Sequence, residues 1–142
     1  MIQSCVLLGT LGLHSIEDIR QKKITVNLTL ISAILGVLLH LLFQNQSIFM
    51  MLTGMLSGAA VLAAACLTKG KIGIGDGMVF MLTGLYLGLK ENLLLMLISF
   101  SAAGLWALFL ITVRHCKKTE RIPLVPFLFF GYSLMIFCEV CI

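Results

Sequence analysis

The sequence predicts an all-α, polytopic membrane protein with about six transmembrane helices, and three observations lead to this prediction. Of the 142 residues, 60% are hydrophobic and 11% are charged, whereas a soluble domain is about half apolar and about a quarter charged. The apolar residues form six runs with short polar breaks between them. Nine of the ten basic residues lie in alternate breaks. We therefore expect residues 1–142 to form one membrane-embedded domain.

The six apolar runs cover residues 2–16, 24–43, 48–68, 78–89, 93–113 and 122–142. A helix needs about 20 residues to cross a membrane, so the first and fourth runs are too short. Extending the first to Ile19 and the fourth back to Ile72 gives 18 residues each (2–19 and 72–89). These extensions bring Asp18 and Asp76 into the membrane edge. The first run lacks the basic start and the small-residue cleavage site of a signal peptide, so we expect it to be a retained span.

The basic residues predict the orientation of the bundle. They fall in the first, third and fifth breaks (Glu17–Lys23, Lys69–Gly77 and Arg114–Arg121), and only Lys90 lies in another break. The positive-inside rule then places these three breaks in the cytoplasm and both termini outside. This pattern accounts for the net charge of +4 through membrane topology. We expect the lipid bilayer, and no nucleic acid, as a partner.

Asp18 and Asp76 are the only aspartates of the chain, and the predicted topology brings both to the cytoplasmic edge of the membrane. Two neighbouring carboxylates at low dielectric cannot both ionise easily, so they share a proton. The ionised member can take a proton from water while the protonated member polarises a peptide carbonyl. This pair predicts peptide hydrolysis without a metal or other cofactor. The alternative is that each aspartate only caps a helix or pairs with Arg20 or Lys71.

The cysteines do not suggest a metal site. Five are scattered along the chain, and only Cys138 and Cys141 have the spacing of a ligand pair. A structural metal site needs about four ligands. We therefore expect no metal, and we interpret the pair as ordinary residues at a helix end.

Three segments resemble the motifs of type IV prepilin peptidases, a family of GxGD-type intramembrane aspartic peptidases. Residues 18–27, which begin Asp-Ile-Arg and end in Asn, are similar to a family motif in which D-x-R is followed by I-P-N. Residues 73–76, Gly-Ile-Gly-Asp, match GxGD, and residues 122–127 resemble I-P-x-x-P-F. The resemblance implies Asp18 and Asp76 as catalytic residues. It implies backbone support by two glycines and four candidate site-lining residues: Gly73, Gly75, Arg20, Asn27, Pro123 and Pro126.

The resemblance implies an endopeptidase that cleaves the basic leader peptide of a prepilin-like or preflagellin-like substrate at the cytoplasmic membrane face. Two positions depart from the family pattern: Thr25 stands where proline is common, and Met78 stands where lysine often follows GxGD. No segment corresponds to the N-methyltransferase region of the larger members, so we expect the short, peptidase-only form.

Two other functions stay open at this point. The protein could be a non-catalytic membrane assembly protein, or a small proton-coupled carrier that uses its intramembrane acids. A carrier should need polar residues at the middle of the bundle, where the sequence offers only a few (Thr83, Ser99 and Ser101). This shortage counts modestly against the carrier.

Two smaller predictions concern a histidine and four glycines outside these motifs. His14 lies one helical turn before Asp18 and could face it. Four glycines at small-xxx-small spacing predict close helix packing: Gly54, Gly58, Gly84 and Gly88.

Overall fold

The computed structural model describes residues 2–21, 24–43, 47–68, 73–114 and 123–141, and these residues form six helices. The helices are α1 (Ile2–Gln21), α2 (Val26–Phe43), α3 (Ile48–Leu67), α4 (Ile74–Leu87), α5 (Leu89–Arg114) and α6 (Val125–Cys141). The all-α prediction is confirmed.

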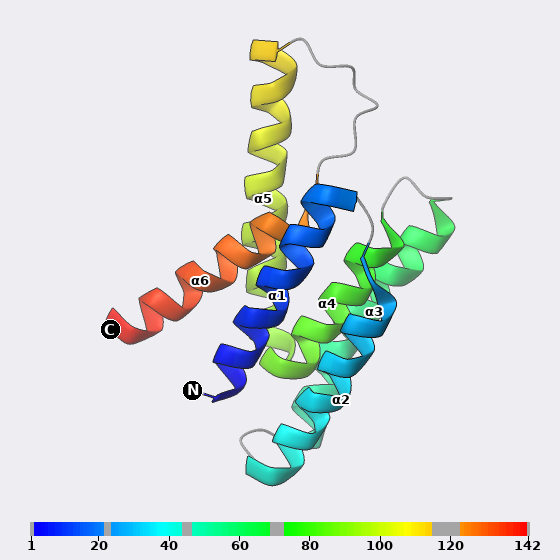
Figure 1. Ribbon diagram of the computed structural model, residues 1–142, viewed down its shortest axis with the longest axis vertical. Helices are drawn as coiled ribbons and strands as arrows, with labels where there is room; N and C mark the ends of the chain where they lie inside the picture. The colour runs from blue at the N-terminus through cyan, green and yellow to red at the C-terminus, as the bar shows by residue number, and fades with distance from the viewer. Residues whose placement is uncertain (1, 22–23, 44–46, 69–72, 115–122, 142) are drawn as a thin grey trace.

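Successive helices run in alternating directions, as the short connections require (Figure 1). The ends of α1 and α3 and the starts of α2 and α4 lie toward one end of the bundle, the upper end in Figure 1, and α5 also ends on that side. The central helix is α4, which packs against α1, α2, α3 and α5. Its core side chains include Val79, Phe80 and Leu82.

The outer surface is apolar. Leucine, isoleucine and phenylalanine side chains are exposed along α2, α3 and α5, including Ile34, Leu56 and Leu105. Three helices are long and apolar enough to cross a membrane (Val26–Phe43, Ile48–Leu67 and Leu89–Val113), and Ile74–Leu87 and Val125–Glu139 are shorter apolar helices. A soluble protein does not expose so large an apolar surface. The chain is therefore an all-α membrane protein.

Glycines bring α3 and α4 into backbone contact. A Cβ atom on Gly54 would overlap the backbone of Gly84 and Gly88, and one on Gly58 would overlap the backbone of Phe80 and Met81. Small residues let two helices approach this closely in a membrane, where dispersion contacts and hydrogen bonds hold helices together. The predicted close packing at these glycines is confirmed.

The predicted break at Lys90–Asn92 is wrong. The chain turns at Gly88 alone, whose φ of 78° favours glycine, and α5 begins at Leu89. Asn92 is fully buried: its amide donates to Ser57 Oγ (2.8 Å) and to the Phe80 carbonyl (3.1 Å), and its oxygen accepts from Thr83 Oγ1 (2.6 Å). A polar residue in an apolar sequence here joins three helices and does not mark a loop.

The helices that carry the two aspartates differ from the predicted lengths. Helix α1 continues past Ile19 to Gln21, and α4 has 14 residues, beginning at Ile74. Ile72, where we expected α4 to start, lies outside the described residues. Both aspartates are nevertheless helical, as predicted: Asp18 lies in the last turn of α1 and Asp76 in the first turn of α4.

Candidate active site

Asp18 is buried, with 7% of its surface exposed, and its side chain points to the start of α6. The backbone N–H of Val125, the first residue of α6, donates to Oδ2 at 3.2 Å. The backbone of Leu124 also hydrogen-bonds this carboxyl group. The first N–H groups of a helix have no partner within the helix and favour an anion. A residue of α1 therefore caps a helix that lies more than 100 positions later in the sequence.

This contact joins the first and third sequence motifs. Pro123 and Pro126 flank the two residues whose backbone meets Asp18, and both prolines are half-buried. Pro126 lies in the first turn of α6, where a helix tolerates a residue without an N–H group. The two prolines fix the backbone around the donors, which leaves the N–H groups of Leu124 and Val125 directed at Asp18.

Asp76 lies close to Gly73, the residue that precedes its own helix. Its backbone N–H donates to the carbonyl of Gly73 at 3.1 Å. A Cβ atom on Gly73 would stand 2.7 Å from Asp76 Oδ2, so the absence of a side chain at Gly73 leaves the carboxyl group its space. Asp76 is half-buried. Gly73 therefore supports the conformation of Asp76.

Gly75 joins the segment after α1 to the start of α4. A Cβ atom on Gly75 would stand 2.8 Å from Ile24 Cδ1 and 3.0 Å from Ile24 Cβ. Ile24 directly precedes Thr25 and belongs to the connection between α1 and α2. Gly75, the residue before Asp76, is therefore in contact with Ile24, which follows Asp18 by six positions in the sequence.

The two aspartates lie toward the same end of the bundle, because α1 ends there and α4 begins there (Figure 1). Helices α1 and α4 are also in contact with each other. This arrangement satisfies the condition that a two-aspartate site imposes, since carboxyl groups on opposite faces of a membrane could not act together.

The remaining predicted site residues, Arg20 and Asn27, lie at helix ends. Arg20, in the last turn of α1, and Asn27, in the first turn of α2, are both exposed. Lys71, an alternative partner for Asp76, lies outside the described residues.

The two positions that depart from the family pattern are also in this region. The Thr25 hydroxyl donates to Glu17 Oε1 at 2.9 Å, and its N–H donates to Glu17 Oε2 at 3.3 Å. Proline has neither donor, so this contact depends on threonine. Met78 is half-buried in the second turn of α4.

His14 faces α2 and Glu17, which differs from the predicted contact with Asp18. Its Nε2 lies 3.3 Å from the Thr29 hydroxyl, and its Nδ1 lies 3.5 Å from Glu17 Oε2. The side chain is fully buried. The spacing of four residues suggested that His14 and Asp18 face each other. The prediction is only approximate, because the Asp18 side chain points to α6 and the His14 side chain points to α2.

Sequence reasoning missed a series of polar contacts between α1 and α2, which we call the α1–α2 polar seam. Three α1 side chains meet Thr25, which directly precedes α2, and two α2 side chains: Glu17 with Thr25, His14 with Thr29, and Thr10 with Ser32. The signal was present, since residues 10, 14 and 17 and residues 25, 29 and 32 each have the spacing of one helix face. Polar side chains in membrane helices commonly hydrogen-bond across the interface.

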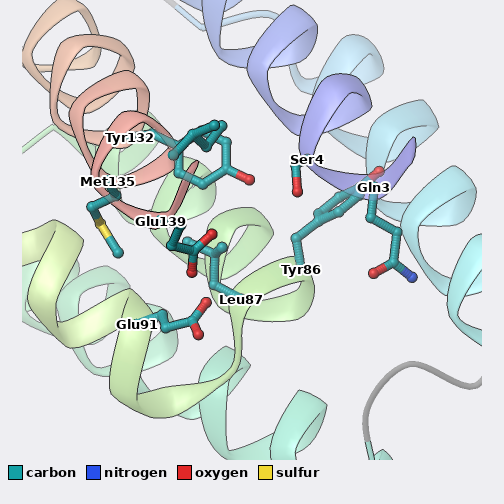
Figure 2. A pocket seen from close by; sticks show the side chains of 9 residues that line it. Gln3, Ser4, Tyr86, Leu87, Glu91, Tyr132, Met135 and Glu139 are labelled. Carbon is teal, nitrogen blue, oxygen red and sulfur yellow. The ribbon is translucent and has the colours of Figure 1, made fainter. Parts of the chain in front are cut away.

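A cavity of about 90 Å³ lies at the other end of the bundle. Its lining includes Ser4 near the start of α1 and Tyr86 near the end of α4. Figure 2 shows the carboxyl groups of Glu91 and Glu139 turned toward each other across this cavity. Because it lies far along both helices from Asp18 and Asp76, this cavity is not part of the candidate active site.

In a comparison with protein families, the type IV leader peptidase family matches residues 5–108. The matched segment contains Asp18 and residues 73–76 and ends before the segment 122–127. No curated protein and no solved structure matches the chain significantly. The family match covers well over half of the chain, and the protein belongs to the type IV leader peptidase family.

Proposed function

We propose that the protein is an aspartic endopeptidase that removes the basic leader peptide from prepilin-like or preflagellin-like substrates. Its family supports a leader peptidase in general. The observation that supports a two-aspartate mechanism is the placement of Asp18 and Asp76 at the same end of the bundle (Figure 1). The basic residues of the first, third and fifth breaks in the sequence favour a cytoplasmic active site in a multi-pass protein with both termini outside.

In the proposed reaction the two aspartates act as a general acid–base pair. The ionised carboxylate takes a proton from a water molecule, which attacks the scissile carbonyl carbon. The protonated carboxyl group donates a hydrogen bond and then a proton to the carbonyl oxygen, which gives a tetrahedral intermediate. The intermediate collapses as the C–N bond breaks: the carboxyl group that took the proton of water gives it to the leaving amine nitrogen, and the other carboxylate takes the proton of one hydroxyl group of the intermediate. Both aspartates are then back in their starting protonation states.

The other motif residues support this site in the proposal. Gly73 leaves space for the carboxyl group of Asp76, and Gly75 leaves space for Ile24 beside the start of α4. Pro123 and Pro126 hold the backbone that hydrogen-bonds Asp18. Arg20 and Asn27 are exposed near the ends of their helices, where they can line the entry of the leader.

The test is co-expression with a prepilin and measurement of leader removal by gel shift. Asp18→Asn and Asp76→Asn should each abolish cleavage, because asparagine keeps the shape of the side chain but cannot exchange a proton. Membrane fractionation should show that both variants remain inserted.

Glu91→Gln is the matched control, since Glu91 is an acid at the opposite end of the bundle. This variant should cleave at the normal rate. Normal cleavage by either aspartate variant would refute the two-aspartate mechanism, and no cleavage by the unaltered protein with any prepilin or preflagellin would refute the proposed substrate class.

A further inference from the structure

The α1–α2 polar seam includes a histidine that the proposed mechanism does not use. His14 is fully buried, and its two ring nitrogens face different elements: Nε2 faces Thr29 of α2, and Nδ1 faces Glu17 of α1. Within the described residues Nδ1 has no hydrogen-bond partner, although Glu17 Oε2 lies 3.5 Å away. Burying an imidazole between two helices costs free energy unless its polar atoms are engaged. A purely apolar residue would fill this place at lower cost.

Glu17 links His14 to the segments that carry the two aspartates. It directly precedes Asp18 in the chain, and it binds both the backbone N–H and the hydroxyl group of Thr25. Thr25 in turn follows Ile24, the residue seated on Gly75 beside Asp76. A continuous series of contacts therefore leads from the Asp18 segment through Glu17, Thr25 and Ile24 to the Asp76 segment.

We propose that His14 is a positioning residue that sets the placement of Asp18 relative to Asp76. Its contact with Thr29 fixes the register of α1 on α2, and its contact with Glu17 directs that carboxylate to Thr25. In this proposal His14 acts through these two contacts and does not exchange protons with the substrate. This inference rests on the proposed two-aspartate function.

The test measures kcat and KM for leader removal in purified protein. His14→Leu keeps the volume of the side chain and removes both polar contacts. We expect kcat to fall by about tenfold to a hundredfold, since small misplacements of a catalytic group cost this much, with KM unchanged because His14 does not contact the leader. His14→Gln places an amide near the position of Nε2 and should restore most of the loss.

Thr29→Val probes the same contact with a milder change, which guards against misfolding of His14→Leu. It should lower kcat in the same direction, and it should add little in the His14→Leu background because the two residues act as a unit. The matched control is Tyr86→Phe, which removes another buried hydrogen bond onto α2, from the Tyr86 hydroxyl to the Ser32 carbonyl (2.8 Å). This variant should leave kcat within about twofold of the unaltered protein, since a lost bond far from the site shifts no catalytic group.

The outcomes separate the two proposals. If Asp18→Asn and Asp76→Asn are inactive but His14→Leu and Thr29→Val keep normal kcat, the positioning role is overturned and the proposed function stands. A rise in KM at constant kcat, or an equal loss of kcat in Tyr86→Phe, would likewise overturn it. If either aspartate variant is active, the proposed function itself fails.

Discussion

Asn92 joins three helices, α3, α4 and α5, by hydrogen bonds of its side chain. Its side chain is fully buried and makes hydrogen bonds to Ser57 of α3 and to Thr83 and Phe80 of α4. In a membrane no water competes for these groups, so the contacts join α5 to both neighbours. The stability of this region therefore depends on one amide.

We expect Asn92→Leu to lower the free energy of unfolding by about 1–2 kcal/mol, the range found for interhelical hydrogen bonds in model membrane peptides. Thermal unfolding in detergent would measure the change. Thr112→Val is the matched control, because the exposed Thr112 hydroxyl bonds carbonyls of its own helix. An Asn92 variant as stable as this control would show that the buried contacts contribute nothing.

Helices α3 and α4 form the most extensive contact in the molecule. The contact depends on glycines facing backbone, at Gly58 against Met81 and at Gly54 against Gly84. Since backbone cannot turn aside as a flexible side chain can, an added methyl group must move a whole helix.

Gly58→Ala should therefore destabilise the protein by about 1–3 kcal/mol, the usual cost of overpacking. Gly104→Ala in α5 makes the same chemical change where nothing lies within 4 Å. There the substitution should be neutral or stabilising by up to about 1 kcal/mol, because alanine favours a helix. Unfolding in detergent compares the two, and equal melting temperatures would contradict the role of close packing.

At the scale of the whole molecule, the helices alternate in direction. The helix ends that flank the basic breaks of the sequence therefore lie on one side of the bundle (Figure 1). Anionic lipid and the positive-inside rule then favour a single orientation. Both termini would be on the outer side of the membrane.

A fusion of alkaline phosphatase to the C-terminus should consequently be active, since this enzyme works only outside the cytoplasm. A fusion of green fluorescent protein at the same position should be dark. Replacing residues after Arg114 by the same reporters should reverse the result. Fluorescence at the full-length C-terminus would contradict the predicted orientation.

Six helices and the helical placement of Asp18 and Asp76 could be predicted from the sequence, because apolar runs and the glycines between them are local signals, but the bounds of α1 and α4 could not. The sequence did not predict the turn at Gly88, where Asn92 resembled a loop residue but is buried. Nor did it predict that Asp18 bonds the backbone at Val125, which lies 107 positions away. Such contacts depend on how the helices pack, and a single sequence carries no direct record of that packing.

The pairing of helices has a consequence for selection on this protein. Helix α1 packs most extensively on α6, and α3 packs most extensively on α4, so Asp18 and Asp76 belong to different tightly packed pairs. The contact of Ile24 with Gly75 links the two pairs near the aspartates. Under the proposed mechanism, a substitution inside either pair of helices is tolerated when the protein still folds stably. Substitutions at Ile24 and Gly75 instead change the rate of the reaction. Selection for catalytic alignment therefore acts on this interface as well as on the two carboxyl groups.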